Sequence, residues 1–440
     1  MYKYILGLFI FFCGFQLKAQ EVLSLENVIE IGLKNNYDIV IANNNIVEAD
    51  NNITLGNAGF LPTLDIEGNY ARNNNLRFKG VVSRERGDSS FVLRNVESSN
   101  YGIDAVFNWQ FFDGTKMFIT YEKLEDLREK ARWDAKVVVE ATLSSILSAY
   151  FNIINQKSAL SILEGTLKLS QERLKIAKDK YELGSFSKAE YLSAQVDYNE
   201  DQSALIAQKG ILNDAKVQLN VLIAREASQQ FSVADSVIKI DGFFEINELR
   251  DKVKAENYEL AASKIAIQIA EREKQEIRSE LLPVLALNAN TGIGGSANPV
   301  GFLRSTETTS FNYALTASWR IFDGFNKNRR IQNAIINEEN QQVTLVQLRQ
   351  QLLGELETQY VRYENRLALI RLEVRNVEVA KENADLALER FKVGRSNSLA
   401  LREAQLNAVE AAGRLLNALY EAKIAEIEIL RISGSTITDG

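Results

Sequence analysis

Apolar residues recur at helical spacing along an uninterrupted stretch from Thr115 to Gly184, which contains no proline. Its later part is a heptad seam, stepping by three and four positions through Leu160, Leu163, Leu167, Ser170, Leu174, Ala177 and Tyr181. One α-helix of about 70 residues would be roughly 100 Å long. Since no single globular core can cover such a helix, the pattern predicts neighbouring helices along its whole length.

The first of these neighbours follows directly in the sequence. After Gly184 the heptad spacing resumes through Leu205, Leu212 and Leu219. Glycine is typical of the position just after a helix, because it adopts a positive φ without strain. We therefore predict a long helical hairpin that turns at Gly184.

Four shorter runs alternate between apolar and polar side chains, which predicts β-strands. They cover residues 64–71, 103–111, 285–291 and 313–321. Each run is about ten residues long, which is the length of a tilted transmembrane strand. Residues 73–100 and 292–312 are polar and are expected to be the loops that join the strands of each pair.

The order helix, strand, strand, long helix, glycine turn, long helix occurs twice in the chain. The offset between matching residues is 221 before the strands and 210 after them, so the first strand-joining loop is longer by 11 residues. We divide the chain into a signal peptide (1–19), a first repeat (20–240) and a second repeat (241–440). The matches are Asn36 with Asn257, Pro62 with Pro283, Asp113 with Asp323, Tyr181 with Phe391, Gly184 with Gly394, and Gln195 with Gln405.

The N-terminal segment is typical of a secretory signal peptide. It has a cationic start at Lys3, an apolar run over 5–15 and the small residue Ala19 before Gln20. A buried N-terminal strand is the alternative. Cys13 does not indicate a lipoprotein, because the residue before it is not small. After this segment, a single helix is predicted from Ser24, as its N-cap, to about residue 57.

Composition argues against an enzyme. The chain has no histidine, and Cys13 is its one cysteine, so thiol and imidazole chemistry is absent after signal removal. We expect no catalytic site, metal or cofactor. The net charge is −7, and −9 without Lys3 and Lys18, which disfavours nucleic-acid binding. No segment after the signal approaches 18 consecutive apolar residues, so no transmembrane helix is expected.

Four strands in one chain cannot close a barrel, and an open sheet edge cannot face lipid. Two copies would give eight strands and a filled interior, whereas three would give twelve and leave room for a channel. The alternative is a soluble β-sandwich with one wet face. The polar face favours a wet lumen, and its residues are Asp65, Glu67, Asn69, Asp104, Asn108 and Gln110.

The doubled order of elements, the Leu-Pro before each strand pair and the glycine hairpin tips resemble the TolC family of outer-membrane efflux proteins. The resemblance spans about Ser24 to Ser433. It implies a mainly α fold with membrane β: long antiparallel coiled-coil helices form an α-barrel, and four strands per protomer enter a trimeric 12-stranded β-barrel. The implied function is the exit duct of a tripartite efflux pump or type I secretion system. This duct would lie in the outer membrane, with its helical part in the periplasm.

The same resemblance implies the partners. They are two further copies of the chain, outer-membrane lipid, a periplasmic adaptor and an inner-membrane pump of the RND or ABC type. The alternative function is a periplasmic coiled-coil adaptor, which would carry one hairpin and no amphipathic membrane strands.

The resemblance also assigns candidate sites. Glu403 would narrow the periplasmic end of the tunnel, with Glu190 and Arg395 as a closing ion pair; a solvated coiled-coil charge is the alternative for Glu403. The family's second acidic position holds Ala400 here. Trp109 and Trp319, at matching strand positions, are candidates for an interfacial aromatic girdle, with ordinary strand packing as the alternative. The expected adaptor-docking tips contain Tyr181, Gly184, Ser185, Phe391, Gly394 and Arg395.

Overall fold

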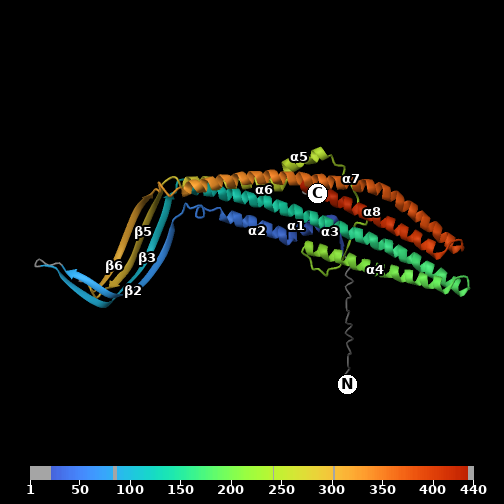
Figure 1. The fold of residues 1–440 in the computed structure, drawn as a ribbon, viewed down its shortest axis with the longest axis horizontal. Helices are drawn as coiled ribbons and strands as arrows, with labels where there is room; N and C mark the ends of the chain where they lie inside the picture. The colour runs from blue at the N-terminus through green and yellow to red at the C-terminus, as the bar shows by residue number, and fades with distance from the viewer. Residues whose placement is uncertain (1–20, 83–86, 241, 301–302, 435–440) are drawn as a thin grey trace, which may run out of the picture. The chain divides into compact units, whose positions relative to one another are not determined.

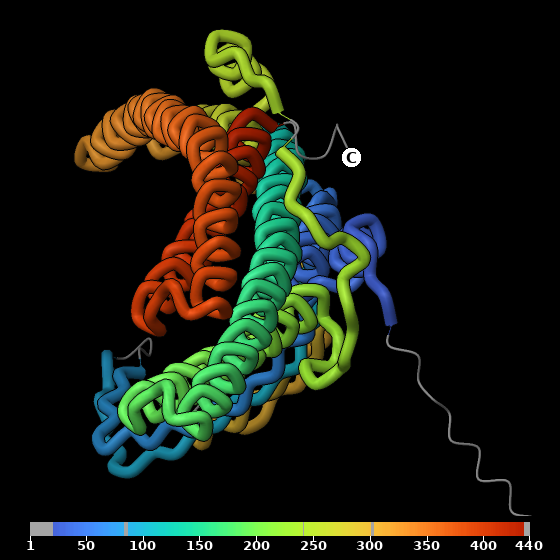
Figure 2. The backbone as a smooth tube through the Cα atoms, turned by 90° about the vertical axis from the view of Figure 1, so that its right-hand side faces the viewer, coloured from blue at the N-terminus to red at the C-terminus, as the bar shows by residue number. Residues whose placement is uncertain are grey.

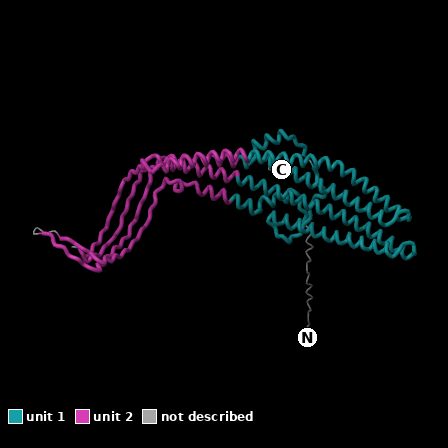
Figure 3. The backbone as a smooth tube through the Cα atoms, in the orientation of Figure 1, with its two compact units in different colours: residues 1–43, 134–260, 348–440 teal, residues 44–133, 261–347 magenta. Residues whose placement is uncertain are grey.

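The computed structural model describes residues 21–82, 87–240, 242–300 and 303–434, so the predicted signal peptide lies outside the described residues. The chain forms two compact units, and each draws on both halves of the sequence (Figure 3). Unit 1 takes residues 1–43, 134–260 and 348–440. Unit 2 takes residues 44–133 and 261–347.

The order α1, α2, β2, β3, α3, α4 in the first half recurs as α5, α6, β5, β6, α7, α8 in the second (Figure 1). The boundary that we placed between the repeats at residue 240 stays a prediction. The bounds are β1 Glu21–Leu23, α1 Leu25–Asn35, α2 Tyr37–Asn52, β2 Thr63–Val82, β3 Ser89–Phe112, α3 Lys116–Glu182, α4 Lys188–Leu222, β4 Phe231–Val233, α5 Ile246–Glu256, α6 Tyr258–Ser279, β5 Val284–Ala297, β6 Ser305–Ser318, α7 Asn326–Lys392 and α8 Ser398–Ser433.

The predicted long helix is confirmed as α3, and its counterpart α7 has the same length of 67 residues. By length and composition alone, α3 contains a stretch that could cross a membrane, and it is the single such helix among the described residues. Half of that stretch is buried within the chain. The apolar character has a structural cause, because Ile146, Tyr150 and Ile154 of α3 lie in the main core of unit 1 beside Leu219 and Phe231.

The prediction of one helix from Ser24 to residue 57 is wrong, although Ser24 is its N-cap and accepts a hydrogen bond from the Asn27 N–H. The helix breaks at Asn36, between α1 and α2. The Asn36 side-chain oxygen accepts hydrogen bonds from the backbone N–H groups of Asp38 and Ile39, which compete with helix continuation. Its side-chain nitrogen donates to the Leu222 carbonyl at 2.8 Å.

The second half has the same break at Asn257, between α5 and α6. Here the side-chain oxygen accepts from the Leu260 N–H and the nitrogen donates to the Ile432 carbonyl, both at 3.0 Å. Leu222 and Ile432 are themselves related by the offset of 210. The matched asparagines therefore fasten equivalent helix breaks to the ends of α4 and α8.

The link between the halves contains a strand that we did not predict. Residues 231–233 form β4, which pairs in parallel with β1. Phe231 and Val233 are buried in the core of unit 1 together with Leu23 and Ile238. The buried side chains of this small sheet share their core with residues of α3 and α4.

Unit 2 carries a four-stranded antiparallel sheet in the order β2-β3-β5-β6 (Figure 1). The strands have 20, 24, 14 and 14 residues, so our lengths of about ten were too short. Residues 73–82 pair with residues 89–98, inside the segment that we expected to be a loop. Backbone pairing continues there because a ladder of N–H and C=O groups does not require apolar side chains.

The register sorts the side chains onto two different faces. One row crosses the sheet as Leu64, Phe107, Ala289 and Tyr313, and the adjacent row crosses it as Asp65, Val106, Asn290 and Asn312. Large apolar side chains on the first face are open to solvent in the single chain, with Leu64 72% and Tyr313 76% exposed. A soluble sandwich would cover such a face, so the exposure favours a sheet that meets lipid.

Candidate functional site

The two helical hairpins of unit 1 end in identical turns, which face the reader in Figure 2. Gly184 and Gly394 have φ of +76° and +74°, as the sequence predicted. The Ser185 N–H donates to the Lys180 carbonyl at 2.8 Å, and the Arg395 N–H donates to the Arg390 carbonyl at 2.8 Å. These bonds, with those from each glycine N–H to the carbonyl three residues earlier, are the Schellman motif of a helix C-terminus.

The helices that follow the turns are capped by side chains. Ser187 and Glu190 form a capping box at the start of α4: the Ser187 N–H donates to the Glu190 carboxylate, and the Glu190 N–H donates to the Ser187 hydroxyl. The sequence Ser-x-x-Glu carries this signal, which we did not use. The Glu190 carboxylate thus caps α4, and the predicted ion pair with Arg395 would have to use the same carboxylate. Asn397 is the N-cap of α8, and its side-chain oxygen accepts a hydrogen bond from the Ala400 N–H.

Apolar side chains join the two hairpins near their tips. Phe391 and Leu401 are fully buried, and with Leu388 they pack against Leu169, Ile176 and Phe186 of the first hairpin. The Lys180 ammonium donates to the Phe391 carbonyl at 2.8 Å and lies over the Phe391 ring. Among the predicted docking residues, Phe391 therefore supports the tip from beneath, whereas Tyr181 is 38% exposed.

A buried charge network, which sequence reasoning missed, lies further along the hairpins. Arg402 of α8 is 8% exposed and holds Asp201 of α4 through two hydrogen bonds of 2.9 and 2.8 Å. Asp201 also accepts from the Ser170 hydroxyl. Nearby, the fully buried Arg173 pairs with Asp197, and burial lowers the pKa of Arg173. In the sequence, nothing distinguishes Asp197, Asp201 and Arg402 from ordinary polar positions on the surface of a helix.

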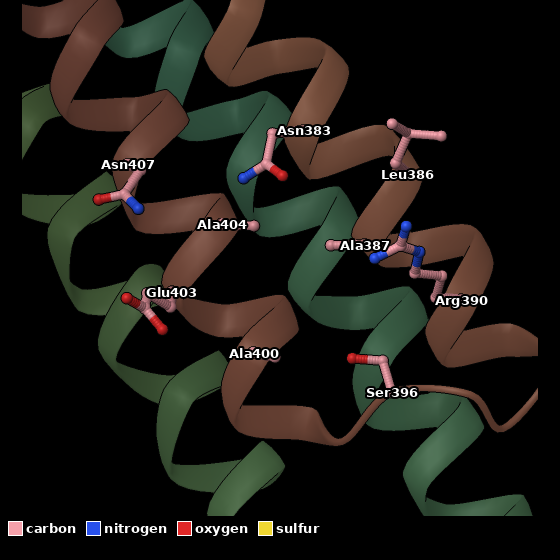
Figure 4. Close-up of a pocket in the computed structure, with 9 residues that line it drawn as sticks. All are labelled: Asn383, Leu386, Ala387, Arg390, Ser396, Ala400, Glu403, Ala404 and Asn407. Carbon is pink, nitrogen blue, oxygen red and sulfur yellow. The ribbon is translucent and has the colours of Figure 1, made fainter.

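The predicted gate residue Glu403 lines a hollow of about 330 Å³ between α7 and α8 (Figure 4). Its side chain is exposed. Arg390, Ser396 and Ala400 line the same hollow, together with Asn383, Leu386, Ala387, Ala404 and Asn407. The two positions assigned to the gate, Glu403 and Ala400, therefore line the same hollow as Ser396 of the second turn.

Both predicted girdle tryptophans donate a side-chain hydrogen bond. The Trp109 indole donates to the Phe60 carbonyl at 3.0 Å, and the Trp319 indole donates to the Leu281 carbonyl at 2.9 Å. Phe60 and Leu281 are equivalent by the offset of 221, two residues before each strand-opening proline. We predicted Trp319 within a strand, but β6 ends at Ser318 and Trp319 follows it. Each indole fixes the entry to its strand pair.

Unit 1 contains one buried acidic side chain whose ionised form is destabilised by its surroundings. Glu140 of α3 is 4% exposed, and its Oε1 has no hydrogen-bond partner among the described residues. Burial raises the pKa of Glu140 to about 7, although the Arg431 charge works in the opposite direction. Arg431 is shared with three other acids, Glu259, Glu355 and Glu428. Within the described ranges, the acidic side chains form no group of three or more that could hold a metal ion.

The curated proteins that are similar in sequence to this chain include two that align with most of its length. Alkaline protease secretion protein AprF of Pseudomonas aeruginosa is 22% identical over 381 residues, which cover 84% of this chain and 75% of AprF. Nodulation protein T of Rhizobium leguminosarum bv. trifolii is 23% identical over 414 residues, covering 90% and 82% of the two chains. Both alignments extend over most of each protein.

The fold matches solved outer-membrane channels. The Campylobacter jejuni CmeC outer membrane channel superposes with a TM-score of 0.71 at 17% identity, over 94% of this chain and 86% of CmeC. The profile described as outer membrane efflux protein matches residues 28–225 and 249–435, so it contains both helical hairpins and all four strands of the sheet. The chain thus belongs to the outer membrane efflux protein family, and it is an outer-membrane channel of the efflux and secretion class rather than a periplasmic adaptor.

Proposed function

We propose that three copies of this chain close a twelve-stranded barrel in the outer membrane and continue as a helical duct into the periplasm. The observation that carries the proposal is the strand order β2-β3-β5-β6, in which β2 and β6 each have one partner among the described residues. In lipid, each unpaired backbone group of such an edge costs several kcal/mol. Pairing β6 of one copy with β2 of the next removes both edges without any further strand.

The two faces of the sheet suit this arrangement. The face that carries Ile66, Phe107 and Leu315 would meet lipid, and the face that carries Glu67, Asp104 and Ser310 would line a wet lumen. Trp109 and Trp319 would lie near one end of the apolar band as part of an aromatic girdle. Eight strands from two copies would enclose too little space for such a polar lining.

The assembly can be tested on the purified full-length protein. Cysteine pairs placed on β6 and β2 should cross-link neighbouring copies into bands of two and three chains. Pairs placed on β3 and β5, which are adjacent within one chain, serve as the control and should add no mass. Cross-linking that stops at two chains would contradict the trimer.

We further propose that the two hairpin tips dock a periplasmic adaptor, which couples the duct to an inner-membrane pump of the RND or ABC type. The exposed turn residues Gly184, Ser185, Gly394 and Arg395 form this surface, with Tyr181 beside them and Phe391 beneath. The relative AprF is named for protease secretion, and OpmQ of Pseudomonas putida is named for pyoverdine export. Photo-cross-linkers at Ser185 and Arg395 should capture the adaptor in cells. Capture from Glu226, on the loop after α4, in place of the tips would contradict the assignment.

For the gate we propose that three copies of Glu403 converge at the periplasmic end of the duct and make the resting pore cation-selective. Glu190 of the first hairpin would supply a second acid near the tip. Single-channel recordings of Glu403→Ala in planar bilayers should show reduced cation selectivity and weaker block by multivalent cations. Glu226→Ala removes an exposed acid away from the tips and is the matched control. Equal selectivity in wild type and Glu403→Ala would place the constriction elsewhere.

A further inference from the structure

The first strand pair projects beyond the rest of the sheet, at the end opposite to its connections with the helices (Figure 1). The last pairing of β3 with β5 joins Ser99 to Ala297. Beyond it, residues 73–82 of β2 and 89–98 of β3 pair with each other and, among the described residues, with no further strand. We call these two segments the outer ribbon. Because the helical part lies in the periplasm, the outer ribbon belongs to the outer side of the membrane.

One face of the outer ribbon is basic. Arg77 and Arg94 lie directly opposite each other across the two strands, and Lys79 lies two residues further along the same face. All three side chains are exposed, and none makes a hydrogen bond or ion pair with a described residue. Like charges directly opposite each other destabilise a strand pair. A bound anion would relieve this repulsion.

The acid within the outer ribbon does not neutralise the basic face. Glu97 is the one acidic residue of the two segments, and its cross-strand neighbour is Asn74. Both therefore lie on the opposite face, since side chains alternate between the faces of a strand. There the Glu97 carboxylate forms an ion pair with Arg72. The hairpin thus has one cation that is paired, at Arg72, and three on the other face that are not.

The opposite face of the outer ribbon is apolar and continues the face of the sheet that we assign to lipid. Phe78 follows Ile66 at an even spacing along β2, so the two side chains share a face. The Phe78 and Phe91 rings are 6.2 Å apart. Phe91 also lies over Gly80, where an added Cβ would be 2.6 Å from the ring. These aromatic contacts tie the two strands of the outer ribbon together.

The basic face, by the same alternation, continues the face that we assign to the lumen. Arg77 and Lys79 follow Glu67 at an even spacing along β2. We propose that Arg77, Lys79 and Arg94 form a cationic collar at the outer mouth of the duct, which binds solutes that carry several phosphate or carboxylate groups. Guanidinium groups bind both kinds of anion through paired hydrogen bonds. The inference rests on the proposed function, because three copies around one axis bring the three cations of each copy together.

The collar is separated from the acids of the lumen face. Glu67 and Asp104 lie directly opposite each other, ten residues before Arg77 along β2. Ten residues of strand extend over about 33 Å. Exposed charges are largely screened beyond about 8 Å at physiological ionic strength. A solute that leaves the duct would therefore meet an acidic band first and a basic band at the exit.

Recordings from single channels in planar bilayers test the collar, with inorganic polyphosphate as the probe. The long helices of the full-length protein cannot cross the bilayer, so channels insert with their outer mouths in the chamber opposite to the added protein. Polyphosphate in that chamber should block the wild-type channel. In the triple variant Arg77→Gln, Lys79→Gln and Arg94→Gln, the half-blocking concentration should rise at least about tenfold, because one charge-assisted hydrogen bond accounts for that factor. Arg72→Gln is the matched control and should be blocked like the wild type.

The unblocked conductance shows whether each variant has assembled. If the triple variant does not assemble, Arg94→Gln alone must weaken the block. Equal block of the wild type and the assembled variant would overturn the collar and leave the proposed assembly standing. The collar is also wrong if polyphosphate acts equally from both chambers, or if the variant differs only by losing co-purified phosphate-bearing lipid. A protein that is monomeric in detergent and forms no channel would contradict the proposed function as well.

Discussion

Removing Arg402 should loosen the hairpin tips by a large and specific amount. Arg402→Leu leaves Asp201 with the Ser170 hydroxyl as its remaining partner in a buried site, where both groups are less than a tenth exposed. Breaking a buried ion pair from one side typically costs about 3–5 kcal/mol. The chain itself suggests the compensating change, because the repeat positions of Arg402 and Asp201 hold Leu192 and Ala411. Arg402→Leu with Asp201→Ala should therefore recover most of the loss.

Amide hydrogen exchange measures this effect locally, through the free energy of opening of the helices. At about 3 kcal/mol, peptides from residues 195–205 and 398–406 should exchange more than roughly a hundredfold faster in Arg402→Leu than in wild type. Arg366→Leu is the control, since it breaks the exposed pair with Glu421 and should cost less than about 1 kcal/mol. Equal exchange in Arg402→Leu and Arg366→Leu, or a double variant no better than the sum of the single ones, would refute the reasoning.

Three further outcomes follow from other parts of the chain. Burial raises the pKa of Glu140 to about 7 in the folded protein. The folded state therefore binds a proton more readily than the unfolded state. The stability of the wild type should rise as pH falls from about 7 to 4.5. Glu140→Gln should then be more stable than the wild type by up to about 3 kcal/mol at pH 8, and this difference should disappear below about pH 4.5. Melting temperatures of both proteins across this pH range measure the effect. A stability difference that does not change with pH would contradict this account. No atom lies within 4 Å of a Cβ added at Gly184, so the positive φ alone should make Gly184→Val cost at least about 1–2 kcal/mol at the turn. Gly184→Asn should cost less. Limited proteolysis at the tip compares the two variants, and equal resistance to cleavage would argue against backbone strain. Asn257→Ala removes bonds to Leu260 and Ile432 and should cost about 1–3 kcal/mol by denaturant unfolding, whereas Asn247→Ala, an exposed change on α5, should be close to neutral.

Periodicity in the sequence was sufficient to predict the long elements. The heptad seam ending at Tyr181 predicted α3 to within two residues at its end, and Gly184 predicted the turn, because both signals are local and repeated. The doubled order of elements predicted the counterpart helix α7. Alternation of period two predicted which side chains share a face of the sheet, and the cross-strand register confirms this sharing.

Features that depend on side chains distant in the sequence were missed. Asn36 interrupts a helix that propensity would continue, because its amide bonds to the carbonyl of Leu222 far along the chain. The pairing of Arg402 with Asp201 joins residues about 200 positions apart, and neither stands out from the polar face of its own helix. Residues 73–82 and 89–98 pair through their backbones, and their polar side chains do not alternate regularly with apolar ones, so the sequence pattern did not predict strands there.

The number of chains in the complex tests the central claim most directly. Native mass spectrometry of the full-length protein, released from outer membranes in detergent, should give a single species of three chains. We predict this closure because a single copy leaves the β2 and β6 edges of the four-stranded sheet open to lipid. A stable monomer or dimer that still conducts ions in planar bilayers would contradict the account.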